Sequence, residues 1–158
     1  MIMDKYFLGF LIVILSITSC HKDKVNVIAE NDHLIFGTFY GFCGGEGCVE
    51  TFKLTETALY EDTKDVYRTN DGYSFIKLSN EKFNLVKDIA DAIPSALLEE
   101  DEKTFGCPDC YDQGGLMIQI LSDDEVKTWF VDRNKASIPT YLHAISDSIL
   151  AKIELINQ

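Results

Sequence analysis

Basic side chains are scarce in this sequence. It has 14 Lys and Arg residues against 26 Asp and Glu residues, so its formal net charge is −12 at pH 7. A protein that binds nucleic acid needs a basic face to neutralise phosphates, and we therefore expect no nucleic-acid partner. Anionic lipid would also repel so acidic a surface, so surface charge cannot attach this chain to a membrane.

The sequence also lacks the motifs of common catalytic sites. It has three histidines, and no serine lies in the nucleophile-elbow pattern of hydrolases. The glycine-rich stretch 41–47 contains Glu46 and is not followed by the Lys-Ser/Thr pair of a phosphate-binding loop. The acidic runs 99–102 and 123–125 are interpreted as solvated turns. We therefore expect no catalytic residue, no cofactor and no bound metal, and we favour a protein that is not an enzyme.

The N-terminus has the charged start and short apolar core of a secretory signal peptide. Lys5 precedes an uninterrupted apolar run from Tyr6 to Leu15, and small residues then lead to Cys20. A transmembrane helix needs about 20 apolar residues, so this run is too short to serve comfortably as one. We predict a cleavable signal peptide over residues 1–19, with an uncleaved anchor helix as the alternative.

The last residues of this segment resemble the lipobox of bacterial lipoproteins. Ile17-Thr18-Ser19-Cys20 has an aliphatic residue, two small residues and then a cysteine. The resemblance implies that Cys20 becomes the new N-terminus after cleavage and is lipidated. Its sulfur would carry diacylglyceryl, and its N-terminal amine would carry a fatty acid. Several acyl chains together anchor a protein stably. We therefore expect a polar tether over residues 20–31, and a lipid anchor in the cell envelope, at the outer membrane.

Hydrophobic periodicity predicts a single α+β domain over residues 32–158. Alternating segments predict strands over 33–39, 49–54, 58–61, 73–78, 116–121 and 126–131, and helical spacing predicts helices over 80–93 and 139–156. Ser79 or Asn80 can cap the first helix, and Pro94 marks its end. We expect an antiparallel sheet of five to six strands with two helices packed on one face.

The order of a cysteine pair, a hairpin and a helix occurs twice along this domain. An internal duplication would account for that order, and so would the ordinary recurrence of such units in α+β proteins. Residue identity between the two halves is low, whereas true repeats show self-similarity at a fixed period. Both interpretations stay open.

Four cysteines besides Cys20 form two close pairs, and three interpretations compete for them. Cys43 and Cys48 bracket three glycines and Glu46, while Cys107 and Cys110 form a Cys-x-x-Cys motif. An even number of cysteines in an exported chain favours disulfides, and four cysteines allow three connectivities. A four-thiolate zinc site is the second interpretation. Redox catalysis at Cys107 and Cys110 is the third, although no helix is predicted to follow them and activate the first thiol.

The cysteine-bearing segments carry a second resemblance. Gly41-Phe42-Cys43-Gly44-Gly45-Glu46-Gly47-Cys48, Gly106-Cys107-Pro108-Asp109-Cys110 and Ile138-Pro139-Thr140-Tyr141-Leu142 resemble segments of an uncharacterised family of small Bacteroidota lipoproteins. The resemblance covers nearly all of the chain after Cys20. It implies an exported, cysteine-paired domain and supplies no activity.

Aromatic residues flank both cysteine pairs and suggest a binding surface. Loops on a rigid scaffold are a common place for binding residues. We single out Phe42 and Tyr111 as candidates that would contact a protein or a small ligand. The alternative is that these aromatic side chains cover the disulfides and pack against the edge of the sheet, as aromatic residues most often do. Phe39, Tyr40 and Phe105 belong to the same group.

Overall fold

A computed structural model describes residues 28, 32–43, 47–66 and 72–158. The predicted signal peptide over residues 1–19, and the lipidation of Cys20, lie outside the described residues. So does most of the predicted tether over residues 20–31. Ile28 is the described residue within that stretch, and it is buried and belongs to the hydrophobic core. None of the helices in the described part of the chain is both long and apolar enough to span a membrane.

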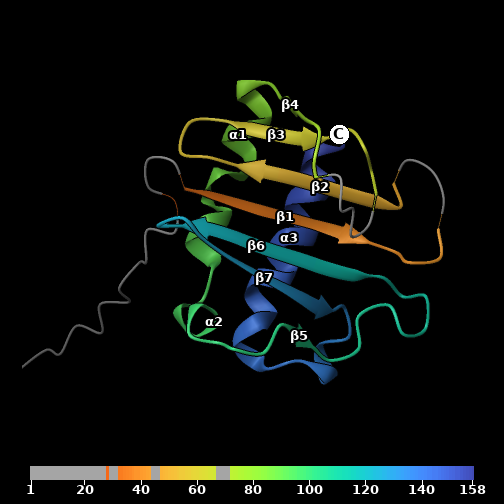
Figure 1. Ribbon diagram of the computed structural model, residues 1–158. Helices are drawn as coiled ribbons and strands as arrows, with labels where there is room; N and C mark the ends of the chain where they lie inside the picture. The colour runs from red at the N-terminus through yellow and green to blue at the C-terminus, as the bar shows by residue number, and fades with distance from the viewer. Residues whose placement is uncertain (1–27, 29–31, 44–46, 67–71) are drawn as a thin grey trace, which may run out of the picture.

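The described residues form a mixed α+β structure around a seven-stranded sheet, whose order is β4-β3-β2-β1-β6-β7-β5 (Figure 1). The strands are β1 His33–Phe39, β2 Val49–Leu54, β3 Leu59–Asp62, β4 Phe75–Lys77, β5 Thr104–Phe105, β6 Gly115–Ser122 and β7 Glu125–Asp132. The expected number of five to six strands was therefore wrong. The missed strand, β5, has only two residues, too few to show any alternation, and it pairs parallel to β7 while all other neighbours are antiparallel.

The helices are shorter than the sequence pattern predicts. The predicted helix over 80–93 is α1 Asn80–Val86 followed by a 3-10 helix, Lys87–Ala92, and the change occurs at Val86, whose φ of −124° lies outside the α region. The Ser79 side chain accepts a hydrogen bond from the Lys82 backbone N–H and caps α1. A short helix that was not predicted, α2 Ser95–Leu98, comes next.

The C-terminal helix also starts later than predicted. A 3-10 turn at Thr140–Leu142 precedes α3 His143–Ile156, the longest helix of the described chain. Pro139 is the N-cap residue of this turn, so the turn begins directly after it. A proline is tolerated at the start of a helical turn, because its φ is fixed and a backbone N–H is not needed there. The buried isoleucines of α3 recur every three or four positions, as a one-sided apolar stripe requires. They are Ile145, Ile149, Ile153 and Ile156, and Ser146 is buried beside them.

The core joins this stripe to one face of the sheet. Helix α3 contacts α1 and β1, and Figure 1 shows α1 and α3 on the same side of the strands. The strand residues of the core occupy alternate positions, because successive side chains of a strand point to opposite faces. Those in the four central strands are Leu34, Phe36, Phe52, Leu54, Leu116, Ile118, Ile120, Trp129 and Val131.

Strand β1 lies at the centre of the sheet, between the two hairpins. It pairs with β2 on one side and with β6 on the other. The β2–β3 and β6–β7 hairpins thus flank it, each preceded in sequence by one cysteine pair. The duplication stays a hypothesis, because the same order also fits an unduplicated antiparallel meander.

Candidate functional site

Each cysteine pair forms a disulfide within its own loop. Cys43 bonds to Cys48 and Cys107 bonds to Cys110, with Cα–Cα distances of 5.5 Å in both cases. That separation is usual for a disulfide. The sequence favours disulfides at these four cysteines and allows three connectivities. In the structure each cysteine pairs with its near neighbour in the sequence.

Pairing of the strands brings the two disulfide loops to the same edge of the sheet. Phe39, the last residue of β1, lies opposite both Val49 at the start of β2 and Gly115 at the start of β6. The chain leaves β1 into the 40–48 loop and enters β6 from the 106–114 loop. These two loops therefore emerge side by side, although about half of the domain separates them in sequence.

Asp109 joins the two loops directly. One carboxylate oxygen, Oδ2, accepts a hydrogen bond of 2.6 Å from the Gly41 backbone N–H in the other loop. The second oxygen, Oδ1, accepts one of 2.9 Å from the Gly114 N–H in its own loop. Asp109 has a φ of +64°, a left-handed conformation that aspartate tolerates better than most residues. Asp109, one of the two residues between Cys107 and Cys110, thus fixes the position of one disulfide loop relative to the other.

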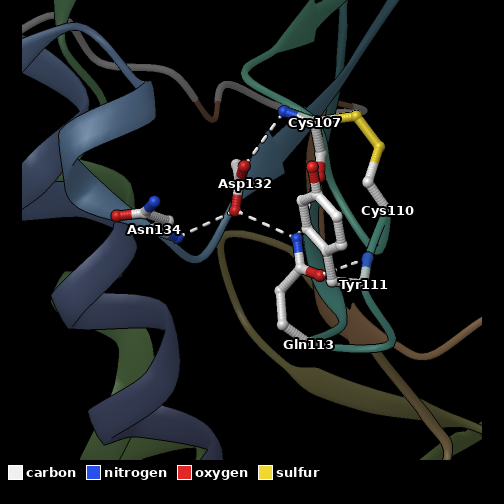
Figure 2. Close-up of a disulfide and its surroundings, with 6 residues drawn as sticks. All are labelled: Cys107, Cys110, Tyr111, Gln113, Asp132 and Asn134. Atoms are coloured by element: carbon white, nitrogen blue, oxygen red, sulfur yellow. Dashed lines mark hydrogen bonds between the residues drawn. A yellow bond between two sulfur atoms is a disulfide. The ribbon is translucent and has the colours of Figure 1, made fainter.

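Asp132 holds the second loop through several hydrogen bonds (Figure 2). This carboxylate is 3% exposed at the end of β7, and its Oδ2 accepts a 3.0 Å hydrogen bond from the Cys107 N–H. Its Oδ1 accepts bonds from the Asn134 N–H at 2.8 Å and from Gln113 Nε2 at 3.4 Å. Gln113 Nε2 also donates to the Cys107 carbonyl, and Gln113 Oε1 accepts a bond of 2.7 Å from the Tyr111 N–H. Sequence reasoning missed Asp132, because its partners in the second loop, Cys107 and Gln113, lie far from it along the chain.

The aromatic residues beside the disulfides divide into two groups. Phe39 and Phe105 are 2% and 3% exposed, and each packs edge-to-face on another ring. Phe42 and Tyr111 are 94% and 88% exposed. The packing interpretation therefore describes Phe39 and Phe105, whereas Phe42 and Tyr111 project from the loops into solvent.

Tyr40 lies between these two groups. Its side chain is half-buried, and its hydroxyl accepts a close hydrogen bond from the Arg133 guanidinium. The centre of that guanidinium also lies 5.4 Å from the Tyr40 ring centroid, a cation–π contact. Tyr40 thus ties the first loop to the end of β7.

In the part of the chain that the structure describes, Cys107 does not lie at a helix N-terminus. Cys107 and Cys110 lie in a turn that leads into β6, and no described helix begins at either residue. A helix N-terminus is one of the environments that activate a redox-active cysteine. The Cys107 N–H instead points at the carboxylate of Asp132. Within the residues that the structure describes, no group of three or more His, Cys, Asp and Glu side chains is arranged to hold a metal ion.

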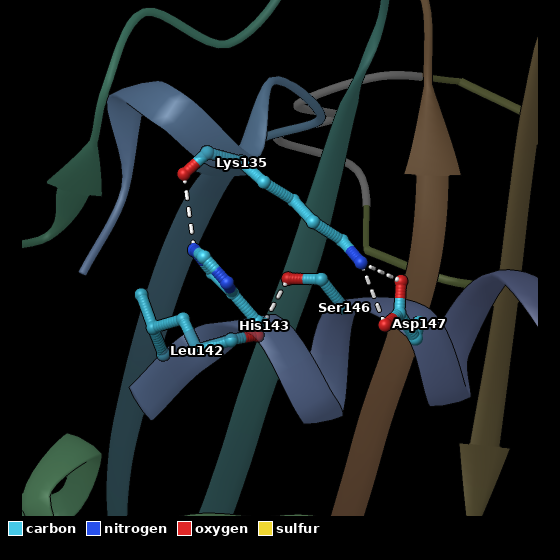
Figure 3. Close-up of polar contacts among 5 residues, drawn as sticks. All are labelled: Lys135, Leu142, His143, Ser146 and Asp147. Carbon is cyan, nitrogen blue, oxygen red and sulfur yellow. Dashed lines mark hydrogen bonds and ion pairs between the residues drawn. The ribbon is translucent and has the colours of Figure 1, made fainter. Parts of the chain in front are cut away.

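His143 and Ser146 make structural contacts at the start of α3 (Figure 3). A ring nitrogen of His143, Nε2, lies 3.0 Å from the Lys135 carbonyl oxygen. The Ser146 hydroxyl donates to the Leu142 carbonyl one turn earlier, at 2.8 Å. Lys135 forms an exposed ion pair with Asp147, with an N–O distance of 2.6 Å. The serine is bonded to the backbone and not to the imidazole, so these residues do not form a nucleophile and base.

Comparison with known proteins adds no assignment. The chain matches no protein-family model, and no curated protein is significantly similar to it.

Proposed function

We propose that this protein is a lipid-anchored lipoprotein of the cell envelope, and that its folded domain is a non-enzymatic binding module. The observation that supports the binding role is the exposure of Phe42 and Tyr111, at 94% and 88%, on two adjoining loops. The lipobox at Ile17-Thr18-Ser19-Cys20 supports the anchor.

The loops carry these aromatic side chains in a constrained form. Each loop is closed by a disulfide, and the Asp109 carboxylate links the two loops through the Gly41 N–H. Constraint of this kind lowers the entropy lost when a loop becomes ordered on binding. Tyrosine and phenylalanine add little further cost, because each has only two side-chain torsions to fix. The loop tips are therefore well suited to contact a partner.

A protein is the partner that this shape fits best. Small ligands are usually enclosed in concave pockets, whereas Phe42 and Tyr111 project outward. Exposed aromatic side chains commonly act as anchors that fill pockets on the partner. We propose that these two side chains insert into an apolar depression of another envelope protein, while the lipid on Cys20 holds the domain at the outer membrane.

The first prediction concerns the anchor. Replacing Cys20 with serine should abolish incorporation of labelled palmitate into the full-length protein. The reason is that the acyl chains require the cysteine sulfur and its processed amine. The matched control is His21→Ala, which should remain labelled. Equal palmitate incorporation in wild type and Cys20→Ser would contradict the proposed anchor.

The second prediction concerns the binding surface. A photoreactive amino acid placed at position 42 or 111 of the membrane-bound protein should cross-link to a discrete partner protein in cells. The same amino acid at Val126, which is 57% exposed on β7, should not give that product. Adding Tyr111→Ala should weaken the cross-link made from position 42. The proposal fails if all three positions give the same products, or if none gives a discrete product.

The double variant Phe42→Ala/Tyr111→Ala separates binding from folding in this experiment. Because both side chains are exposed, their truncation should change the free energy of unfolding by no more than about 0.5 kcal/mol. A loss of several kcal/mol in chemical denaturation would show that these side chains pack against the loops and do not serve as a contact surface.

A further inference from the structure

The sheet carries a recess on the face opposite the core residues. Because side chains alternate along a strand, β1, β6 and β7 each send a second set of residues to this face. Phe39, Met117 and Phe130 belong to this set and line the recess, together with Val49 at the start of β2. Phe39 and Phe130 meet edge-to-face, with their ring centroids 5.8 Å apart. The floor of the recess is therefore largely apolar.

Two described residues between β3 and β4, Val66 and Tyr73, form a wall, so the feature is a pocket and not simply an open sheet face. The Tyr73 hydroxyl lies 3.7 Å from the Met117 sulfur on β6, and its ring stacks at a tilt on Phe75 with 5.0 Å between centroids. Tyr73 is thus held in place from two sides. The pocket has a volume of about 110 Å³.

The lining selects for an uncharged ligand. All the lining residues that the structure describes are apolar or neutral, although the protein carries a net charge of −12. Burial and the nearby Asp62 carboxylate raise the pKa of Tyr73, so its hydroxyl also stays neutral at ordinary pH. A charged ligand would lose its hydration here without gaining a charged partner among the described lining residues.

One polar pair on the floor can orient a ligand. Gln119 Nε2 on β6 donates a 2.8 Å hydrogen bond to the Thr128 hydroxyl on β7. Because the threonine oxygen accepts in this bond, its hydrogen is directed elsewhere, and the carboxamide oxygen of Gln119 remains an acceptor. This pair therefore offers one donor and one acceptor at the side of an apolar pocket, which is the usual composition of a small-molecule site.

We infer that this pocket binds a small uncharged molecule, about one aromatic ring in size, that carries a hydroxyl group. The size follows from the volume, since a closed apolar cavity of about 150 Å³ in another protein accommodates benzene. The present pocket is smaller and open on one side, so part of the ring would remain outside it. The hydroxyl would bond to the Gln119–Thr128 pair, while Phe39, Met117 and Phe130 contact the ring.

Methyl NMR on the full-length chain with phenol as the probe tests this inference. The sequence has three methionines, of which Met117 lines the pocket and Met1 and Met3 belong to the predicted signal peptide. With ¹³C-labelled methionine methyl groups, phenol should shift the Met117 signal saturably and leave any other methionine signal in place. Met117→Leu identifies the signal by removing it. Benzoate, which has a similar ring but carries a charge at pH 7, should bind at least about tenfold more weakly.

Two variants keep the outcome interpretable. Gln119→Leu should weaken phenol about fivefold, because a hydrogen bond worth about 1 kcal/mol is lost, and should leave toluene binding unchanged. Leu155 is partly exposed on α3, and Leu155→Ala should change neither phenol binding nor toluene binding. The absence of a saturable Met117 shift with phenol and with toluene would overturn the inference, and so would equal binding of benzoate. Phe42→Ala/Tyr111→Ala should leave the phenol response intact, so failure of the proposed loop surface is distinguishable from failure of this pocket.

Discussion

Replacing Asp132 with alanine should lower the free energy of unfolding by about 3 kcal/mol. This carboxylate is 3% exposed and accepts hydrogen bonds from the Cys107 N–H, the Asn134 N–H and the Gln113 side chain. The variant leaves the two backbone N–H groups without that acceptor. Unsatisfied buried polar groups each cost about 1–3 kcal/mol, and part of that cost is recovered when water reaches the loop.

Urea denaturation with both disulfides intact measures this change. Asp147→Ala is the matched control, because Asp147 is also an aspartate and forms an ion pair with Lys135. Its side chain, however, is 59% exposed. Exposed ion pairs contribute little, so the control should lose less than about 1 kcal/mol. Equal losses in the two variants would contradict the supporting role of Asp132. Faster hydrogen exchange at the Cys107 N–H in the Asp132 variant would locate the effect in the second disulfide loop.

Phe52→Ala should have the larger effect, a loss of about 3–5 kcal/mol. Phe52 is fully buried in β2, where its ring packs at 5.7 Å between centroids on Phe36 of β1. Truncation to alanine removes a large buried apolar surface and leaves a cavity, because packed cores relax only partly around a deleted side chain. The same denaturation experiment measures the loss.

Phe42→Ala provides a chemically identical control for this prediction. Phe42 is 94% exposed, so the same truncation there removes almost no buried surface and should change stability by less than about 0.5 kcal/mol. A small loss at Phe52 would mean that the sheet and helices do not form the common core described here. A ratio of the two losses near one would have the same meaning.

The sequence predicts those elements whose pattern repeats within the element itself. The apolar stripe of α3 recurs over several turns, and Ile145, Ile149 and Ile153 are buried as that spacing requires. The Ser79 cap is likewise a local signal, because its partner Lys82 lies within the next turn. Strand β5 has no such repeat, since Thr104 and Phe105 form a strand only through pairing with β7.

The candidate site is less accessible to sequence reasoning, because long-range contacts determine it. The pairing of β1 with both β2 and β6 brings the two disulfide loops together, and no feature near Cys43 or Cys107 indicates that meeting. In the sequence Asp109 is one of the two residues inside the Cys-x-x-Cys motif, and nothing in that motif indicates its hydrogen bond with the Gly41 N–H of the other loop. Exposure separates Phe42 from Phe39, yet these aromatic residues look equivalent in the sequence.

The central place of β1 also has a consequence for the order in which the chain folds. Of the two neighbours of β1, β2 follows it closely in the sequence. The other, β6, comes much later, so its residue Leu121 can pair with His33 only after most of the chain has been synthesised. Closing so long a segment slows folding, because its entropy is lost before the contacts form. The two disulfides do not depend on that closure, since each joins cysteines only five or three positions apart. Oxidation can therefore precede assembly of the sheet without crosslinking its halves, and the completed strand pairing then brings two already closed loops together.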